Sequence, residues 1–412
     1  MTPRITSRLS SIILALSLAA CGQPPESPSS PNGSASTPTM AALLPTLTSA
    51  PQASPTVEPT QAPPTEAPTA TSEPALLDPL TGLPVDDPAV LDRPPLAIKI
   101  ANFPRLVRTA QSGLSQADNV WEVYAEGGVT RFNAIFWSRT PERVGNVRSA
   151  RLLDAILMDA YQALLVTSGS STGTMGRLRE DAERYQRVVA EATNYGGCPV
   201  LCREESATTS ANKLFTTPAA VWAIAAERKL AGAPTFDGYA FDANAPTGTP
   251  ITTVHFDWQL NNTIAEWRYD AASGRYARWI DSGDTGPGNP GLVQHVDTLN
   301  GETLMADTIA MIVVPHVPSN IEVNDGAVTQ FSYDVLFTGT GPAHVFRDGV
   351  MIDGTWVREE GKGNLPRFLD TNSNVIAFKP GTTWFAVFSS DSPETMNTDT
   401  ATFQVRFKAP GL

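Results

Sequence analysis

Acidic and basic side chains lie within and between strongly apolar runs in residues 111–151 of this chain. They are Asp118, Glu122, Glu126, Arg131, Arg143, Arg148 and Arg151. Removing a charge from water is costly, so charges in such a setting are either paired with one another or directed at a ligand. Any chemistry that this chain performs is therefore expected first in this segment.

The acids Asp118, Glu122 and Glu126 are of the type that performs general acid–base catalysis or holds a divalent cation. Glu122 and Glu126 are the candidate catalytic residues, because a strand or a helix through them places both on one face. The alternative is that the acids form structural salt bridges with the arginines of the segment. This alternative is favoured because buried charges are usually paired. Whether the protein is an enzyme is left open by these residues.

The arginines predict an anion site. Arg148 and Arg151, with Ser149 between them, precede an apolar helical run, and guanidinium groups match phosphate and carboxylate oxygens with two parallel bonds. A helix N-terminus also favours anions. The loop at 168–174 offers further donors, but it lacks the lysine of a P-loop, which argues against nucleotide hydrolysis by that mechanism. The predicted ligand-binding residues are Arg131, Arg148, Ser149, Arg151 and Asp118.

All four histidines, His255, His295, His316 and His344, lie in the second half of the chain. A Ser-His-Asp, Cys-His or histidine-rich metal site confined to the first half is therefore excluded. His295 and Asp297 have a spacing that allows an acid–base pair or two metal ligands, yet a structural hydrogen bond is the favoured interpretation. No metal and no cofactor is predicted.

Aromatic residues are frequent in the second half of the chain. They include Trp258, Trp267, Trp279, Trp356, Trp384, Tyr269 and Tyr276. Such residues can form a platform for carbohydrate, but in alternating strands they more often belong to the core, and the core is favoured here.

The elements expected to position these residues alternate between strands and helices. Strands are predicted at 96–102, 120–126 and 131–138, the last two antiparallel around Gly127-Gly128. Helices at 152–162 and 174–188 flank a further strand at 163–169. The pattern predicts an α/β layered domain with a mixed sheet over 78–228. Short alternating runs over 245–410 predict a mostly antiparallel β-rich domain, so the fold class is α+β.

The N-terminus has the features of a bacterial lipoprotein signal over residues 1–20. Arg4 and Arg8 precede a short apolar run, which ends in small residues and Cys21. The alternative is an ordinary secretory signal with a chance cysteine. No later segment approaches the ~20 apolar residues of a spanning helix. We therefore expect a lipid on Cys21, attachment to the cell membrane and an extracytoplasmic location.

Residues 21–77 are rich in Pro, Ser, Thr and Ala and contain few large apolar side chains. Such a segment cannot bury enough surface to offset its backbone entropy, so a disordered tether is predicted. The chain as a whole is acidic, with a net charge of -13. Nucleic acid is therefore not an expected partner, and any anion site must be a local feature.

Besides Cys21, the chain contains only Cys198 and Cys202. A disulfide that closes a tight loop is the leading interpretation in an oxidising compartment, with free buried thiols as the alternative. The three-residue gap is not that of a thioredoxin-type motif, and two cysteines alone make a poor zinc site.

Several motifs resemble those of the YerB-like lipoproteins, a bacterial domain-of-unknown-function family. They are DPLTGLP (78–84), RPPLAIKIAN (93–102), the run 111–132, VGNVRSAR (144–151), VMIDGTWVR (350–358) and KPGTTWF (379–385). The resemblance implies an N-terminal α/β domain followed by a β-rich domain, and it supplies no reaction. This chain lacks a histidine in SANKLFTT (210–217) and after the strand at 163–169, which puts in doubt any role of histidine at those places.

Two classes of function follow. The first is a membrane-anchored module that binds an anionic or phosphorylated ligand of the cell envelope through the Arg/Glu site. The second is an envelope enzyme that acts on a phosphate-containing or glycan substrate, with Glu122 or Glu126 as the base and the arginines stabilising charge. Binding is favoured, because no pair of nucleophile and base is visible in the sequence.

Overall fold

The computed structural model describes residues 75–204, 213–230, 232, 234–258, 263–282, 291–325 and 328–410. The predicted signal, Cys21 and almost all of the predicted tether lie outside these residues, as do residues 210–212 of the SANKLFTT run. No helix within the described ranges is long and apolar enough to cross a membrane.

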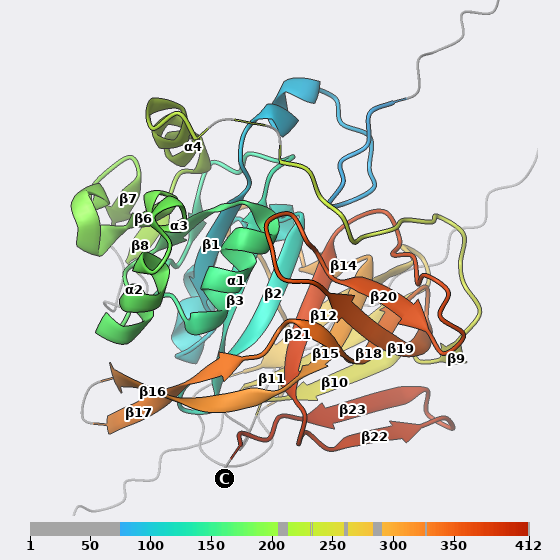
Figure 1. The fold of residues 1–412 in the computed structure, drawn as a ribbon. Helices are drawn as coiled ribbons and strands as arrows, with labels where there is room; N and C mark the ends of the chain where they lie inside the picture. The colour runs from blue at the N-terminus through green and yellow to red at the C-terminus, as the bar shows by residue number, and fades with distance from the viewer. Residues whose placement is uncertain are drawn as a thin grey trace, which may run out of the picture. The chain divides into compact units, whose positions relative to one another are not determined.

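Strands predominate over helices, and the largest sheet has eleven strands (Figure 1). The main order is β20-β19-β18-β15-β21-β2-β3-β1-β5-β6, and β9 also pairs with β19. These strands are β1 (Leu96–Ala101), β2 (Asn119–Ala125), β3 (Val129–Phe136), β5 (Leu164–Thr167), β6 (Val188–Ala190), β9 (Thr249–Pro250), β15 (Thr308–Val314), β18 (Gly339–Arg347), β19 (Val350–Arg358), β20 (Arg367–Asp370) and β21 (Thr383–Ser389).

This sheet is mixed and contains strands from both halves of the chain. The predicted antiparallel pair is confirmed, since β2 and β3 pair in that sense, while β1–β5 and β5–β6 are parallel. The halves meet where β2 runs parallel to β21, with Trp121 opposite Phe385. The sheet therefore joins the two sequence segments that were predicted as separate domains.

A second sheet is built entirely from the C-terminal half. It comprises β10 (Thr253–Asp257), β11 (Ile264–Asp270), β12 (Arg275–Asp281), β13 (Leu292–Gln294), β14 (Met305–Ala306), β22 (Glu394–Asn397) and β23 (Thr402–Arg406). Its pairs are antiparallel, as predicted for this half, except that β10 and β23 run parallel.

Two small sheets complete the strands. The hairpin of β16 (His316–Asp325) and β17 (Val328–Val335) forms a two-stranded sheet. The other small sheet has the order β4-β8-β7, with β4 (Val144–Gly145), β7 (Leu201–Arg203) and β8 (Leu214–Thr216).

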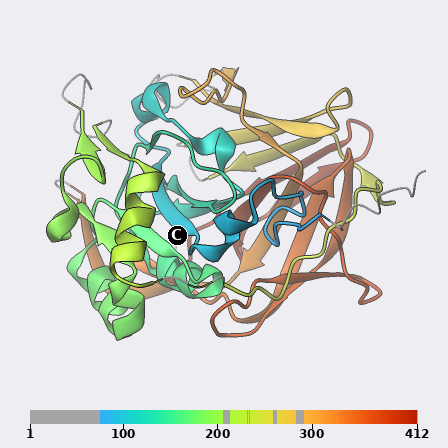
Figure 2. The same cartoon turned by 90° about the horizontal axis from the view of Figure 1, so that it is seen from above.

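The described helices lie between residues 88 and 227, and the green helices of this region gather at one side in Figure 2. The helices are α1 (Leu152–Tyr161), α2 (Thr172–Arg179), α3 (Ala182–Gln186), α4 (Pro218–Glu227), the short η1 (Pro88–Asp92), η2 (Arg105–Ala110) and η3 (Leu114–Gln116), and the π-turn η4 (Glu191–Tyr195). The helix predicted at 174–188 is in fact two helices. Asp181 begins the second one, because its carboxylate accepts the backbone N–H of Arg184 at 2.8 Å.

Both faces of β2 are buried, as its apolar content requires. Val120 lies in a core that includes residues of the second sheet, such as Trp267. Trp121 faces the other way, packs with residues of α1 and stacks on Phe385 with ring centroids 4.2 Å apart. This alternation is the two-residue period that the sequence predicted. It sends Glu122 toward the second sheet.

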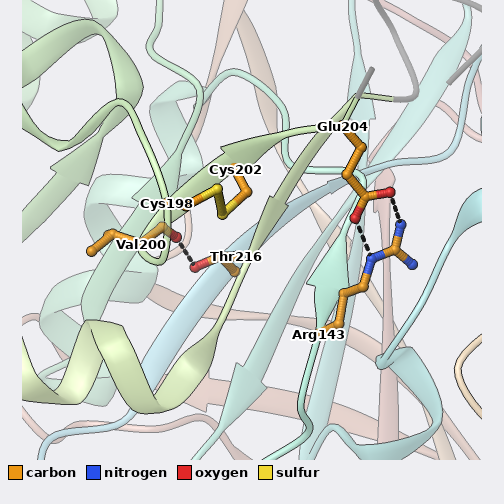
Figure 3. The surroundings of a disulfide bond; sticks show 6 residues. All are labelled: Arg143, Cys198, Val200, Cys202, Glu204 and Thr216. Atoms are coloured by element: carbon orange, nitrogen blue, oxygen red, sulfur yellow. Dashed lines mark hydrogen bonds and ion pairs between the residues drawn. A yellow bond between two sulfur atoms is a disulfide. The ribbon is translucent and has the colours of Figure 1, made fainter. Parts of the chain in front are cut away.

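Cys198 forms a disulfide with Cys202 of β7, with their Cα atoms 4.6 Å apart (Figure 3). The loop that the bond closes is tied to β8, because the Thr216 hydroxyl donates to the carbonyl of Val200 at 2.7 Å. Nearby, Arg143 makes two 2.8 Å bonds to the carboxylate of Glu204. Arg143 therefore serves this small sheet and does not join the other arginines of its segment.

Candidate functional site

A cavity of about 630 Å³ lies between the N-terminal helices and the β16–β17 hairpin. One wall carries Arg131 from β3 together with Arg148, Ser149 and Arg151, which precede α1. Residues 170–173 at the start of α2 extend this wall, and residues 320–323 of β16 form the opposite one. The structure thus brings together four of the five predicted ligand-binding residues and omits Asp118.

The guanidinium groups of this wall are held in place by the backbone. Arg131 donates from Nη1 to the carbonyl of Ser149 at 2.7 Å, and Arg151 donates from Nη1 to that of Ala150 at 3.0 Å. Arg151 also forms an ion pair with Glu126, in which both side chains are less than a tenth exposed. These bonds orient the arginines and reduce the entropy lost when an anion binds.

The segment of Arg148 is fixed against the end of β5. The carbonyl of Arg148 accepts the Thr167 hydroxyl at 2.8 Å and the backbone N–H of Ser168 at 3.1 Å. The hydroxyls of Ser149 and Ser168 are 3.3 Å apart. A strand end and a helix start therefore meet at this wall, as the sequence predicted.

A buried ion pair anchors the start of α1. Asp154 accepts the backbone N–H of Arg151 at 2.7 Å with one oxygen, and it accepts Lys99 Nζ at 2.7 Å and Asn133 Nδ2 at 3.0 Å with the other. Lys99 and Asp154 are fully buried. Burial lowers the pKa of Lys99, and the charge of Asp154 opposes that shift. The sequence analysis missed this pair, although a lysine in the middle of the apolar run LAIKIA was a visible signal.

Helix α2 supplies the second part of the cationic wall. Ser171 caps it by accepting the backbone N–H of Thr174 at 3.2 Å. The first turn of a helix has N–H groups with no partner inside the helix, and its dipole favours negative charge. Gly173 lets β16 approach closely, since a Cβ at this position would lie 2.6 Å from Cγ2 of Ile321.

The hairpin is attached to the arginine wall through Glu126. The hydroxyl of Ser332 on β17 donates to one oxygen of Glu126 at 2.8 Å, while Arg151 bonds to the other. A second link joins Arg177 of α2 to Asp334 at 3.4 Å. Residues distant in sequence therefore line the cavity together. The run HVPSNIEVND (316–325) contains no local motif from which its place in the cavity wall could be predicted.

The three acids considered as catalytic or cation-binding residues, with salt bridges as the favoured alternative, take three separate sets of partners. Asp118 accepts the backbone N–H groups of Trp137 and Ser138 at 2.5 and 3.0 Å and the Ser138 hydroxyl at 2.5 Å. Glu122 pairs with an arginine of the second sheet, and Glu126 pairs with Arg151. The carboxylate cluster is thus not formed, because partners elsewhere in the fold separate side chains that alternation puts on one face.

Glu122 is the counterion of Arg278 from β12. Arg278 donates from Nη2 to both oxygens of Glu122 at 3.0 and 2.9 Å, and both side chains are fully buried. The carboxylate also accepts the Thr130 hydroxyl at 2.9 Å and the indole N–H of Trp384 at 3.1 Å. The structure therefore surrounds the candidate base Glu122 with donors and places it outside the lining of the cavity.

Aromatic rings and a histidine surround this ion pair. The guanidinium carbon of Arg278 lies 4.7–5.4 Å from the ring centroids of Phe132, Trp267 and Trp384, within the range of cation–π attraction. His295 is buried beside them, with Nε2 2.5 Å from Oε1 of Gln111. Burial and the nearby arginines hold the pKa of His295 well below its ordinary value.

The motif HVD serves the structure, which is the interpretation that the sequence favoured. Asp297 accepts the backbone N–H groups of Gly113 and Ser115 at 2.9 and 2.8 Å, so it ties the second sheet to the segment that precedes β2. His295 bonds to Gln111 of the same segment. Most of the aromatic residues considered as a platform belong to the core, since Trp258, Trp267, Trp356, Trp384 and Tyr276 are buried.

Two family models match consecutive parts of this chain. The protein of unknown function (DUF3048) N-terminal domain matches residues 80–231, and the C-terminal domain of the same family matches residues 253–385. The chain belongs to the DUF3048 family.

Its similarity extends to a named protein and to a solved structure. The chain is 27% identical over 312 residues to the "Putative lipoprotein YerB" of Bacillus subtilis (strain 168), which covers 75% of this chain and 85% of that protein. The crystal structure of the YerB protein from Bacillus subtilis has a TM-score of 0.58 and 26% identity, over 76% of this chain and 96% of that one. The resemblance inferred from the sequence motifs is thereby confirmed.

Both DUF3048 segments contribute to the cavity. The arginine wall and the start of α2 belong to the N-terminal segment, and residues 320–323 belong to the C-terminal one. The cavity is therefore a property of the two segments together.

Proposed function

We propose that this DUF3048 protein is a membrane-anchored extracytoplasmic lipoprotein that binds an anionic ligand of the cell envelope in the cavity of Arg131, Arg148 and Arg151. The observation that carries the proposal is that one arginine of β3 and two arginines of the segment before α1 line one cavity of about 630 Å³. Cavities of ~300–1,000 Å³ are typical of small-molecule sites.

The charge of the chain supports the same function. The protein as a whole has a net charge of -13, so a cavity lined by arginines is a local exception to its acidic composition. Hydrogen bonds to charged groups contribute roughly 1.5–3 kcal/mol each. Two or three such bonds are therefore enough to bind a small phosphate or carboxylate group. Ser149 and the first turn of α2 line the same wall and supply further donors.

The membrane anchor rests on the N-terminal sequence and on the relative. The relative carries the name "Putative lipoprotein YerB", and the predicted signal of this chain ends in small residues directly before Cys21. A lipid on this cysteine and the tether that follows would hold the ligand-binding part outside the membrane, at a distance from its surface.

Arg148→Ala is expected to weaken the binding of ethyl phosphate by about 10- to 100-fold, as expected for the loss of one charge-assisted hydrogen bond. The measurement is isothermal titration calorimetry on the full chain in detergent at low ionic strength. Affinity should also fall as salt is added, because anion and arginine attract each other electrostatically.

Arg367→Ala is the matched control. Arg367 lies on β20 with its side chain about half exposed, and it pairs with Asp237 away from the cavity. Its replacement should leave the affinity unchanged. Equal affinities of the wild-type and Arg148→Ala proteins, or no binding by the wild-type protein, would remove the basis of the proposed site.

Cys21→Ser is expected to move the protein from the membrane fraction to the soluble fraction of the producing cells. Serine has no thiol to accept the lipid, so the proposed anchor cannot form. Fractionation with immunodetection measures the distribution, and mass spectrometry of the wild-type N-terminus reports the lipid. Membrane retention of the variant would contradict the anchor.

A further inference from the structure

The wall of the cavity that faces the arginines presents aliphatic side chains. This wall is formed by residues 320–323 of β16. Asn320 and Glu322 are exposed, whereas Ile321 is half-buried and Val323 is buried. Successive side chains of a strand point to opposite faces. Ile321 and Val323 therefore share one face of the hairpin, and the two polar residues lie on the other.

The face of Ile321 is the one that meets the arginine wall. A Cβ on Gly173, at the start of α2, would lie 2.6 Å from Cγ2 of Ile321, so this isoleucine is in contact with the helix. Ser332 of β17 is buried, and its hydroxyl donates to Glu126, the partner of Arg151. Both strands of the hairpin thus turn the same face toward the cavity.

We infer that the cavity takes an amphiphilic anion, in which a phosphate group is esterified to an aliphatic chain. The inference rests on the proposed function, because the arginines must first bind the phosphate. The chain then lies against Ile321 and Val323 on the opposite wall. A cavity of about 630 Å³ is large enough for both parts of such a ligand.

The chemistry of the two walls favours a phosphate monoester. Three arginines, Ser149 and the first turn of α2 line one wall, and the three terminal oxygens of a phosphate monoester accept more of their hydrogen bonds than the two oxygens of a carboxylate. The other wall offers aliphatic surface, and removing such surface from water is favourable. A sugar in the same place would bring hydroxyl groups against side chains that cannot bond to them, which is unfavourable.

The experiment compares two probes of the same charge that differ by three methylene groups, methyl phosphate and n-butyl phosphate. Each is titrated by calorimetry into the full chain in detergent, and a titration into detergent alone gives the background. The cavity variants are Ile321→Thr and Val323→Thr, which place a hydroxyl group on the aliphatic wall. The control is Val317→Thr, the same change on β16 at a side chain that is 44% exposed and outside the lining of the cavity.

The wild-type and Val317→Thr proteins are expected to bind butyl phosphate about 5- to 20-fold more tightly than methyl phosphate. This range corresponds to partial burial of the chain, since a fully buried methylene group gives roughly fourfold. Ile321→Thr and Val323→Thr should each lower the preference at least about threefold. Their affinity for methyl phosphate should stay within about twofold of the wild type, which also shows that they are folded.

Two results would overturn the preference for an aliphatic chain and leave the anion site in place. One is equal binding of both probes by the wild type, a comparison that needs no variant to fold. The other is an unchanged preference in both cavity variants. Binding of neither probe by the wild type overturns the anion site as well.

Discussion

Replacing Glu122 with alanine is expected to lower the free energy of unfolding by about 3–5 kcal/mol, the range for breaking a buried ion pair. Glu122 and Arg278 are fully buried and bonded at 2.9 Å between the large sheet and the second sheet. Without the carboxylate, the guanidinium remains charged inside a shell of aromatic rings. Denaturant unfolding followed by tryptophan fluorescence measures the loss.

A second substitution separates the orphaned charge from lost packing. Arg278→Met removes the guanidinium and keeps a long apolar side chain, so Glu122→Ala/Arg278→Met should be more stable than Glu122→Ala alone. Glu142→Ala, at an exposed site, should stay within ~0.5 kcal/mol of the wild type. The ion pair would have no structural role if Glu122→Ala behaved like this control.

Asp78→Asn is expected to remove a pH dependence of the free energy of unfolding between about pH 4 and pH 7. The carboxylate of Asp78 accepts the backbone N–H of Leu80 at 2.8 Å and the Thr81 hydroxyl at 3.0 Å. Burial, and next the negative charge of Asp118, raise the pKa of Asp78 to about 7 from the ordinary 3.8. The folded protein therefore holds a proton here that the unfolded chain has released.

The direction of the effect follows from that proton. The contribution of Asp78 to stability is fully present below the unfolded pKa of 3.8. It is lost as the pH rises through the folded pKa, at up to about 1.4 kcal/mol per pH unit. The buried His316 acts in the opposite direction, since burial lowers its pKa to about 4 from 6.5. Stability from this neutral histidine is lost as the pH falls below its unfolded pKa.

The quantity to measure is therefore the difference in the free energy of unfolding between the wild type and Asp78→Asn. The contributions of the histidines are the same in both proteins and cancel in this difference. Unfolding free energies at half-unit steps from pH 4 to pH 7.5 are compared for the two proteins. The free energy of unfolding of Asp78→Asn should rise relative to that of the wild type as the pH rises, by as much as roughly 4 kcal/mol over three pH units. Parallel curves would mean that Asp78 titrates normally.

Much of the local structure around the site could be predicted from the sequence. The alternation in residues 119–125 correctly indicated a strand with two different faces, and the apolar stripe after Arg151 correctly indicated a helix start. These signals are local, because a strand or helix repeats its contacts within a few residues. The same reasoning failed at 174–188, where the capping bond of Asp181 outweighs the continuous helical pattern.

The partners of the charged residues could not be predicted in this way. Glu122 bonds to Arg278, 156 positions along the chain, and Glu126 bonds to Ser332 on a distant hairpin. Alternation identified the face of β2 on which an acid lies, but which cation meets that face depends on how the sheets pack. Three acids close together in sequence consequently ended in three different environments.

Residue types and their spacing were enough to show a resemblance to the family of this protein, the alternation of strands and helices around the charged segment, and Arg131, Arg148, Ser149 and Arg151 as candidates for one site. It took the packing of distant elements to show that these four residues line a common cavity, that Asp118 and Glu122 lie elsewhere, and that residues 320–323 of β16 form the facing wall. The two kinds of information differ because they depend on contacts at different distances along the chain. Backbone periodicity is set by near neighbours, whereas a buried charge takes its partner from whichever element the folded chain brings beside it.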